Sequence, residues 1–144
     1  MLTQQDIALV RSSFAKVAPI KDAAATLFYD RLFEIAPQVR GMFPDDLTEQ
    51  KIKLMAMIAT AVGGLDDLGA LVPAVKALGA RHVTYGTKPE HYQTVAEALL
   101  WTLGKGLGDG FTPDVESAWT RVYGMLATTM QEGAAETAKT QAAE

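Results

Sequence analysis

The apolar residues of this chain recur at intervals of three and four positions from one end to the other, which places them on one face of successive α-helices. In the first such segment, the residues with this spacing are Ile7, Val10, Phe14 and Val17. No segment shows the alternation typical of a half-buried strand, and no sequence unit repeats. The pattern therefore predicts an all-α fold of about seven helices.

Capping residues, glycines and prolines predict where these helices begin and end. Thr3 and Asp6 approximate a capping box at the start of the first helix, and Thr87 with Glu90 matches the same motif later in the chain. Pro73 is expected near the start of a helix, because proline disrupts a helix interior. The predicted helices cover about residues 3–19, 21–36, a short segment from 37, 46–62, 70–83, 87–107 and 112–132.

The chain is expected to form one domain. Its 144 residues match the size of a single ordinary domain, and no linker-like segment divides them. From Gly133 onward the sequence loses its apolar stripe. We therefore expect the domain to cover residues 1–137 and residues 138–144 to form a frayed tail.

The composition argues against several classes of protein. With no cysteine in the chain, disulfides, thiolate nucleophiles, zinc fingers, iron–sulfur clusters and thiolate-bound haem are excluded. The net charge of -4 provides no broad positive field for nucleic acid. The longest apolar runs are far shorter than the roughly 20 residues of a membrane span, and the N-terminus lacks the pattern of a secretory signal, so a cytoplasmic location is expected. No conventional catalytic motif is present.

The only two histidines, His82 and His91, are the strongest candidates for metal chemistry. His82 follows Val75 by seven positions and Leu78 by four, so its ring lies on the apolar face of a helix. It is either a core histidine bonded to a backbone carbonyl or an axial ligand to a metal, and neutral imidazole is a common ligand of haem iron. His91 falls in the first turn of the next helix, off its apolar stripe, and is expected to be solvated.

Tyr29 places a hydroxyl on a helix face that is otherwise apolar. A buried phenol needs a hydrogen-bond partner. Tyr29 is therefore either a core residue that donates to a backbone carbonyl or a donor aimed at a bound ligand. Gln50 lies in the first turn of the following long helix, and a functional interpretation of this residue depends on Tyr29 and His82.

In the order Tyr29, Phe43, Gln50, His82 and Tyr92, the chain resembles the globins. It is most similar to the single-domain bacterial haemoglobins and to the haem domain of flavohaemoglobins. The resemblance extends to about residue 131 and is carried by residues 27–43, 71–86, 91–100 and 118–127.

The resemblance implies a globin fold around a haem pocket that holds haem b. It implies that His82 is the proximal iron ligand and that Phe43 packs against the porphyrin. Leu54 is expected to wall the distal pocket. Tyr29 and Gln50 match the distal tyrosine and glutamine of the family.

Two further positions carry expectations from the resemblance, and one departs from it. Lys53 lies toward the rim of the implied pocket and is expected to pair with a haem propionate. Tyr92 matches a tyrosine that, in flavohaemoglobins, joins the proximal histidine and a glutamate in a hydrogen-bonded set. The glutamate position is held here by Ala134, with Glu132 and Glu136 on either side.

The function implied by the resemblance is reversible binding of oxygen, carbon monoxide and nitric oxide. Conversion of nitric oxide to nitrate is expected only with an external reductase, because the sequence stops after the part similar to the haem domain. The alternative is a haem-based gas sensor or interaction module acting through a partner, which the lack of an output domain in the sequence disfavours. Monomer and homodimer both remain open.

Overall fold

The computed structural model describes the backbone of residues 2–84 and 87–143 and the side chains of residues 2–82 and 87–136. Its α-helices are α1 (Gln4–Val17), α2 (Lys21–Ile35), α3 (Thr48–Gly63), α4 (Leu68–Thr84), α5 (Pro89–Leu107) and α6 (Pro113–Ala143). Its 3₁₀ helices are η1 (Ala18–Ile20), η2 (Pro37–Met42) and η3 (Gly108–Gly110). The described residues form no strand, so the all-α prediction is confirmed, and η2 is the short helix predicted after Pro37.

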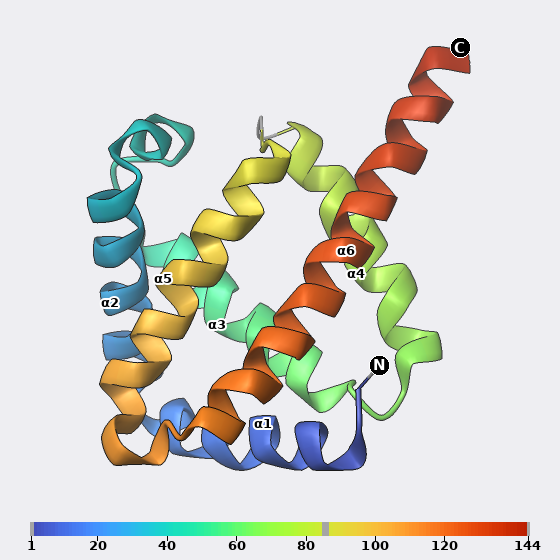
Figure 1. Ribbon diagram of the computed structural model, residues 1–144. Coiled ribbons are helices and arrows are strands. Elements are labelled where there is room, and N and C mark those ends of the chain that lie inside the picture. The colour runs from blue at the N-terminus through green and yellow to red at the C-terminus, as the bar shows by residue number, and fades with distance from the viewer. Residues whose placement is uncertain (1, 85–86, 144) are drawn as a thin grey trace.

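The helices cross one another rather than lining up as a parallel bundle (Figure 1). The N-terminal helix α1 runs along one edge of the molecule, and α6 rises from that edge and crosses α4. On the other side, α2 packs against both α5 and α3. Among the described residues, no helix combines the length and apolar character needed to cross a membrane.

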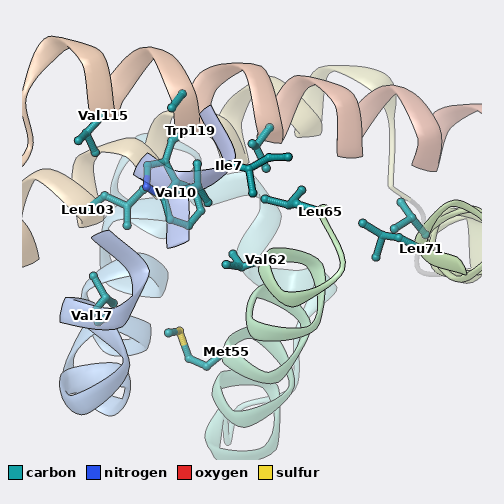
Figure 2. Close-up of a cluster of buried hydrophobic side chains, with 14 of the residues drawn as sticks. Ile7, Val10, Val17, Met55, Val62, Leu65, Leu71, Leu103, Val115 and Trp119 are labelled. Atoms are coloured by element: carbon teal, nitrogen blue, oxygen red, sulfur yellow. The ribbon is translucent and has the colours of Figure 1, made fainter. Parts of the chain in front are cut away.

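The buried apolar residues form two clusters. The larger one joins α1, α2, α3, α4, α5 and α6, and Figure 2 shows side chains from several of these helices in it, among them Val10, Val62 and Trp119. The indole nitrogen of Trp119 donates to the Ser13 hydroxyl at 2.8 Å, so the one polar atom of this ring is satisfied inside the cluster. The smaller cluster joins α2, η2 and α5 and is built from Phe28, Tyr29, Leu32, Ala36, Val39 and Ala98.

Helix α1 is tied to the rest of the fold at its start. The predicted capping box is confirmed, since the Asp6 amide donates to the Thr3 hydroxyl at 3.0 Å and the Thr3 amide to the Asp6 carboxylate at 3.1 Å. The same carboxylate accepts two hydrogen bonds from Arg121 on α6, at 2.6 and 3.0 Å. The Arg121 guanidinium holds the pKa of Asp6 well below its usual range.

Arg11 links α1 to the end of α3. Its guanidinium donates to the backbone carbonyls of Val62 at 3.2 Å and Gly63 at 3.0 Å, and it pairs with Asp66 at 3.1 Å. The last carbonyls of a helix have no partner within the helix, and a cation there also opposes the negative end of the helix dipole. Arg11 therefore stabilises the C-terminal end of α3 from outside.

The second tryptophan has different surroundings. Trp101 is half-buried on α5, with the Arg31 guanidinium carbon 5.1 Å and the Lys105 ammonium nitrogen 5.5 Å from the centre of its ring. Both distances lie within the roughly 6 Å of a cation–π contact. Arg31 comes from α2, so this contact adds to the packing between α2 and α5.

Three boundaries differ from those predicted. Helix α4 begins at Leu68, so Pro73 lies inside the helix and not in its first turn as predicted; it cannot donate to the Gly69 carbonyl, and its ring crowds that carbonyl. Helix α5 is capped by Lys88 and not by Thr87, because the Lys88 amide donates to the His91 imidazole at 3.0 Å. Helix α6 continues past Gly133 to Ala143, in keeping with the helix propensity of its alanine, glutamate and lysine residues.

Candidate functional site

The predicted distal tyrosine lies in the centre of the smaller cluster. Tyr29 is 3% exposed, and its hydroxyl donates to the backbone carbonyl of Gln50 over 3.5 Å. That distance is at the outer limit of a hydrogen bond, so the phenol is held weakly by this partner. Burial raises the pKa of Tyr29 to about 12, which keeps the hydroxyl protonated and able to donate.

Three phenylalanine rings surround the Tyr29 ring. The ring centres of Phe28 and Phe43 lie 5.0 and 5.7 Å away in edge-on arrangements, and that of Phe33 lies 6.0 Å away. Phe33 and Phe43 also meet each other at 5.5 Å. Contacts of this geometry contribute about 0.5–1.5 kcal/mol each beyond the area that they bury. The rings therefore fix the direction of the phenol.

The first turns of α3 bring three more of the predicted residues near this cluster. The start of the helix is held by Asp46, whose carboxylate accepts from the Thr48 amide at 3.0 Å. Gln50 is half-buried, and Leu54, one turn further on, packs against the smaller cluster. Lys53 is exposed, as expected for a residue toward a rim.

His82 lies near the end of α4 and is half-buried. Its Nδ1 atom is 2.8 Å from the Leu78 carbonyl. Because a carbonyl can only accept, Nδ1 carries the hydrogen, and Nε2 is the nitrogen that has a lone pair for a metal. Burial is the main cause that lowers the pKa of His82; the hydrogen bond to the Leu78 carbonyl opposes this shift, and the Arg81 charge adds to it.

A tyrosine that the sequence reading did not single out braces the start of α5. The Tyr123 hydroxyl on α6 donates to the Tyr92 backbone carbonyl at 2.7 Å. Burial raises the pKa of both phenols. Tyr123 follows Trp119 by one helical turn, and this spacing could have indicated from the sequence that Tyr123 faces the core. Tyr92 itself is half-buried in the first turn of α5.

The carboxylates that flank Ala134 lie near α4. Glu136 forms an ion pair with Lys76 at 3.0 Å. The hydrogen bond that Lys76 donates to Glu136 is the main cause that raises the pKa of Lys76, and the charge of Glu132 adds to it. Both glutamates therefore act on the helix that carries His82, through Lys76.

Several apolar residues of α3, α4 and α5 are incompletely covered by protein. Met57 on α3 is 37% exposed. Ile58 on α3, Leu78 on α4 and Ala96 on α5 are half-buried. Ligand pockets are lined mainly by apolar side chains, so these residues are candidates for the lining of the haem pocket that the sequence resemblance implies.

The structure thus brings Tyr29, Phe43 and Leu54 into one cluster and places Gln50 against it. His82 and Tyr92 lie on either side of the α4–α5 connection. His91, which was not predicted to be a ligand, is engaged in the cap of α5. In the described part of the chain, crossed helices around two apolar clusters define an all-α fold that is not a parallel bundle.

The chain belongs to the globin family, since the family model described as Globin matches residues 26–130. It is 32% identical to a flavohemoprotein of Bacillus subtilis over 130 residues and 36% identical to one of Vibrio cholerae over 132 residues. Each match covers 88% of this chain and 33% of the relative, so the chain spans about one third of the length of these proteins.

Two further relatives match over their full length. A neuroglobin of Tetraodon nigroviridis is 28% identical over 155 residues, which cover 98% of both chains. Among solved structures, an engineered carbene transferase from Rhodothermus marinus, a protein assigned as a nitric oxide dioxygenase, superimposes with a TM-score of 0.88 at 26% identity and 99% coverage of both chains. The predicted globin fold and the resemblance to flavohaemoglobin haem domains are confirmed.

Proposed function

We propose that this chain binds haem b through His82 and holds oxygen, carbon monoxide or nitric oxide beside Tyr29 and Gln50. When bound, haem supplies the iron atom that takes up the diatomic gas. The observation that carries the proposal is the state of two side chains. The His82 ring is oriented by the Leu78 carbonyl at 2.8 Å, and Tyr29 is a buried donor whose contact to the Gln50 carbonyl is long, at 3.5 Å.

His82 acts through its ring orientation. The Leu78 carbonyl, 2.8 Å from Nδ1, fixes the tautomer and the rotation of the imidazole. A neutral acceptor of this kind polarises the ring less than a carboxylate does. The arrangement supports His82 as the residue that would hold the haem iron.

Tyr29 acts as a hydrogen-bond donor. An oxygen ligand carries partial negative charge in the globin site, and a donor in a dry, low-dielectric pocket stabilises such charge. The 3.5 Å contact to the Gln50 carbonyl costs little to give up, so the hydroxyl is available for a better acceptor. The Gln50 amide supplies a second donor, and the surrounding phenylalanine rings keep water away.

Lys53 contributes at the pocket rim. Its exposed ammonium group is placed to pair with a haem propionate. A contact of this kind in water is worth at most about 1 kcal/mol.

The same site converts nitric oxide to nitrate when a separate reductase supplies electrons. Joining one nitric oxide and one oxygen molecule into nitrate consumes one electron. Support comes from the flavohemoprotein relatives and from the structural neighbour that is assigned as a nitric oxide dioxygenase. Oxygen storage and delivery use the same residues, so the ligand chemistry is common to these roles.

The absorption spectrum tests the proposal directly. Purified protein is loaded with haem, reduced, and then exposed to air and to carbon monoxide. We expect distinct spectra for the three states, with the oxygen spectrum reverting on removal of oxygen. A protein that takes up no haem, or whose reduced spectrum does not respond to either gas, refutes the proposal.

A further inference from the structure

Helices α4 and α6 touch through their backbones at two glycines. Gly79 on α4 lies against the Met130 carbonyl of α6, and Gly133 on α6 lies against the Lys76 carbonyl of α4. A methyl group at either glycine would overlap the backbone of the opposite helix. Both glycines are buried, and Figure 1 shows the two helices crossing. No side chain separates the helices at these two points.

The two contacts are reciprocal and determine the register between the helices. Lys76 and Gly79 are three residues apart on α4, and Met130 and Gly133 are three residues apart on α6. Each helix therefore presents one glycine and one carbonyl within a single turn. The Lys76–Glu136 ion pair, at 3.0 Å, continues the contact by one more turn of α6. Sliding α4 along α6 would bring side chains into the places where only glycine fits.

This contact lies directly beside the candidate iron ligand. Gly79 precedes His82 by three positions, so the two residues are neighbours on the surface of α4. Leu78, whose carbonyl orients the imidazole, is bonded to Gly79 in the chain. The backbone that holds the ring is therefore the same backbone that is held against α6.

We propose that this crossing of Gly79 and Gly133 is the positioning element for His82. It holds α4 at a set height and angle on α6 and so limits how far the imidazole of His82 can move. This inference rests on the proposed role of His82 as the iron ligand. Gly79 and Gly133 are positioning residues, because they act through the backbone of α4 and touch neither haem nor gas.

Four glycine-to-alanine variants test the proposal, two at the crossing and two as controls elsewhere on the same helices. Gly79→Ala and Gly133→Ala fill the crossing. Gly69→Ala on α4 and Gly124→Ala on α6 are controls, since a methyl at Gly124 meets nothing within 4 Å and one at Gly69 meets only an Asp67 carboxylate oxygen at 3.9 Å. In the protein without haem, the melting temperature should fall in the crossing variants and stay unchanged or rise in the controls, because alanine is the better helix former.

The positioning role has its own readout, the iron–histidine stretching band in the resonance Raman spectrum of the reduced, gas-free protein. We expect this band to shift or split in Gly79→Ala and Gly133→Ala and to match wild type in both controls. An unchanged band in destabilised crossing variants would show that the crossing serves stability alone and would overturn the inference. A wild-type protein with no such band refutes the role of His82 instead, while the melting comparison still reports on the crossing.

Hydrogen exchange on the wild-type protein keeps the inference testable if a crossing variant does not fold. In the absence of haem, backbone amides of residues 76–82 should exchange more slowly than those of residues 55–60 in the interior of α3, because α6 holds the former through its backbone, whereas α3 packs mainly on α1 and α2. Equal or faster exchange at residues 76–82 would show that α4 is free to move there, and the inference would then be wrong.

Discussion

Replacing Tyr29 by phenylalanine removes one oxygen atom from the distal cluster and leaves the ring in place. The ring is 3% exposed and lies among Phe28, Phe33 and Phe43, so its packing should survive the change. The hydroxyl is held by Gln50, whose backbone carbonyl lies 3.5 Å away and whose side chain also interacts with the phenol. Loss of so long a contact should lower the free energy of unfolding by less than about 1 kcal/mol.

The effect on gas binding should be larger than the effect on stability. A hydrogen bond to a partly charged acceptor contributes roughly 1.5–3 kcal/mol, and about 1.4 kcal/mol corresponds to a factor of ten. Oxygen should therefore leave Tyr29→Phe roughly ten- to a hundred-fold faster than it leaves wild type. Carbon monoxide carries little charge when bound, so its dissociation should change far less. Gln50→Leu should act in the same direction on oxygen, without strict additivity, because both donors share one ligand.

Stopped-flow ligand replacement measures both dissociation rates on the same preparation. Tyr123→Phe is the matched control, since it removes a well-formed 2.7 Å bond to the Tyr92 carbonyl away from the distal cluster. It should lower stability while leaving the ratio of oxygen to carbon monoxide dissociation near wild type. If Tyr29→Phe changes both gases by the same factor, the hydrogen bond is not the cause, and Tyr29 is a core residue that shapes the pocket.

Three other predictions concern haem, electrons and acid. His82→Ala should lose haem in a gel-filtration assay while His91→Ala retains it, because His91 caps α5; equal retention contradicts the assignment. When the oxygenated protein is mixed with nitric oxide, each haem should be oxidised once and the reaction should then stop. Sustained nitrate formation without added reductant would count against the need for an external electron donor. The Arg121 contact depresses the folded-state pKa of Asp6, so the stabilisation is present above the unfolded pKa of about 3.9 and is lost as pH falls toward the folded value. Acid titration of unfolding should show a shallower loss in Asp6→Asn, and identical profiles would exclude this linkage.

Helix positions were predictable from the sequence because their causes are local. The Thr3–Asp6 box and the Thr112–Pro113 start of α6 involve residues within one turn of each other, and the structure confirms both. The cap of α5 was predicted wrongly because two possible capping pairs, Thr87 with Glu90 and Lys88 with His91, lie one residue apart in the sequence. Glu90 was the expected partner, but the imidazole of His91 takes the bond instead.

The site was predictable only in part, since its geometry depends on contacts between distant segments. Periodicity placed His82 and Tyr29 on apolar faces and correctly allowed a backbone carbonyl as the partner of each. Which carbonyl is used, and how weakly Tyr29 is held, follow from the approach of α3 to α2. The glycine crossing had no sequence signal, because Gly79 and Gly133 become meaningful only when α4 and α6 meet.

The two tryptophans provide the protein with two built-in fluorescent reporters in opposite environments. Trp119 is 3% exposed and bonded to Ser13, so its emission should be blue-shifted and insensitive to solutes in water. Trp101 lies half-exposed between the cations Arg31 and Lys105, which attract anions, so iodide should quench its emission selectively. Exposure of Trp119 to iodide would then signal opening of the main core, while Trp101 reports on the α2–α5 surface of the same molecule without any label.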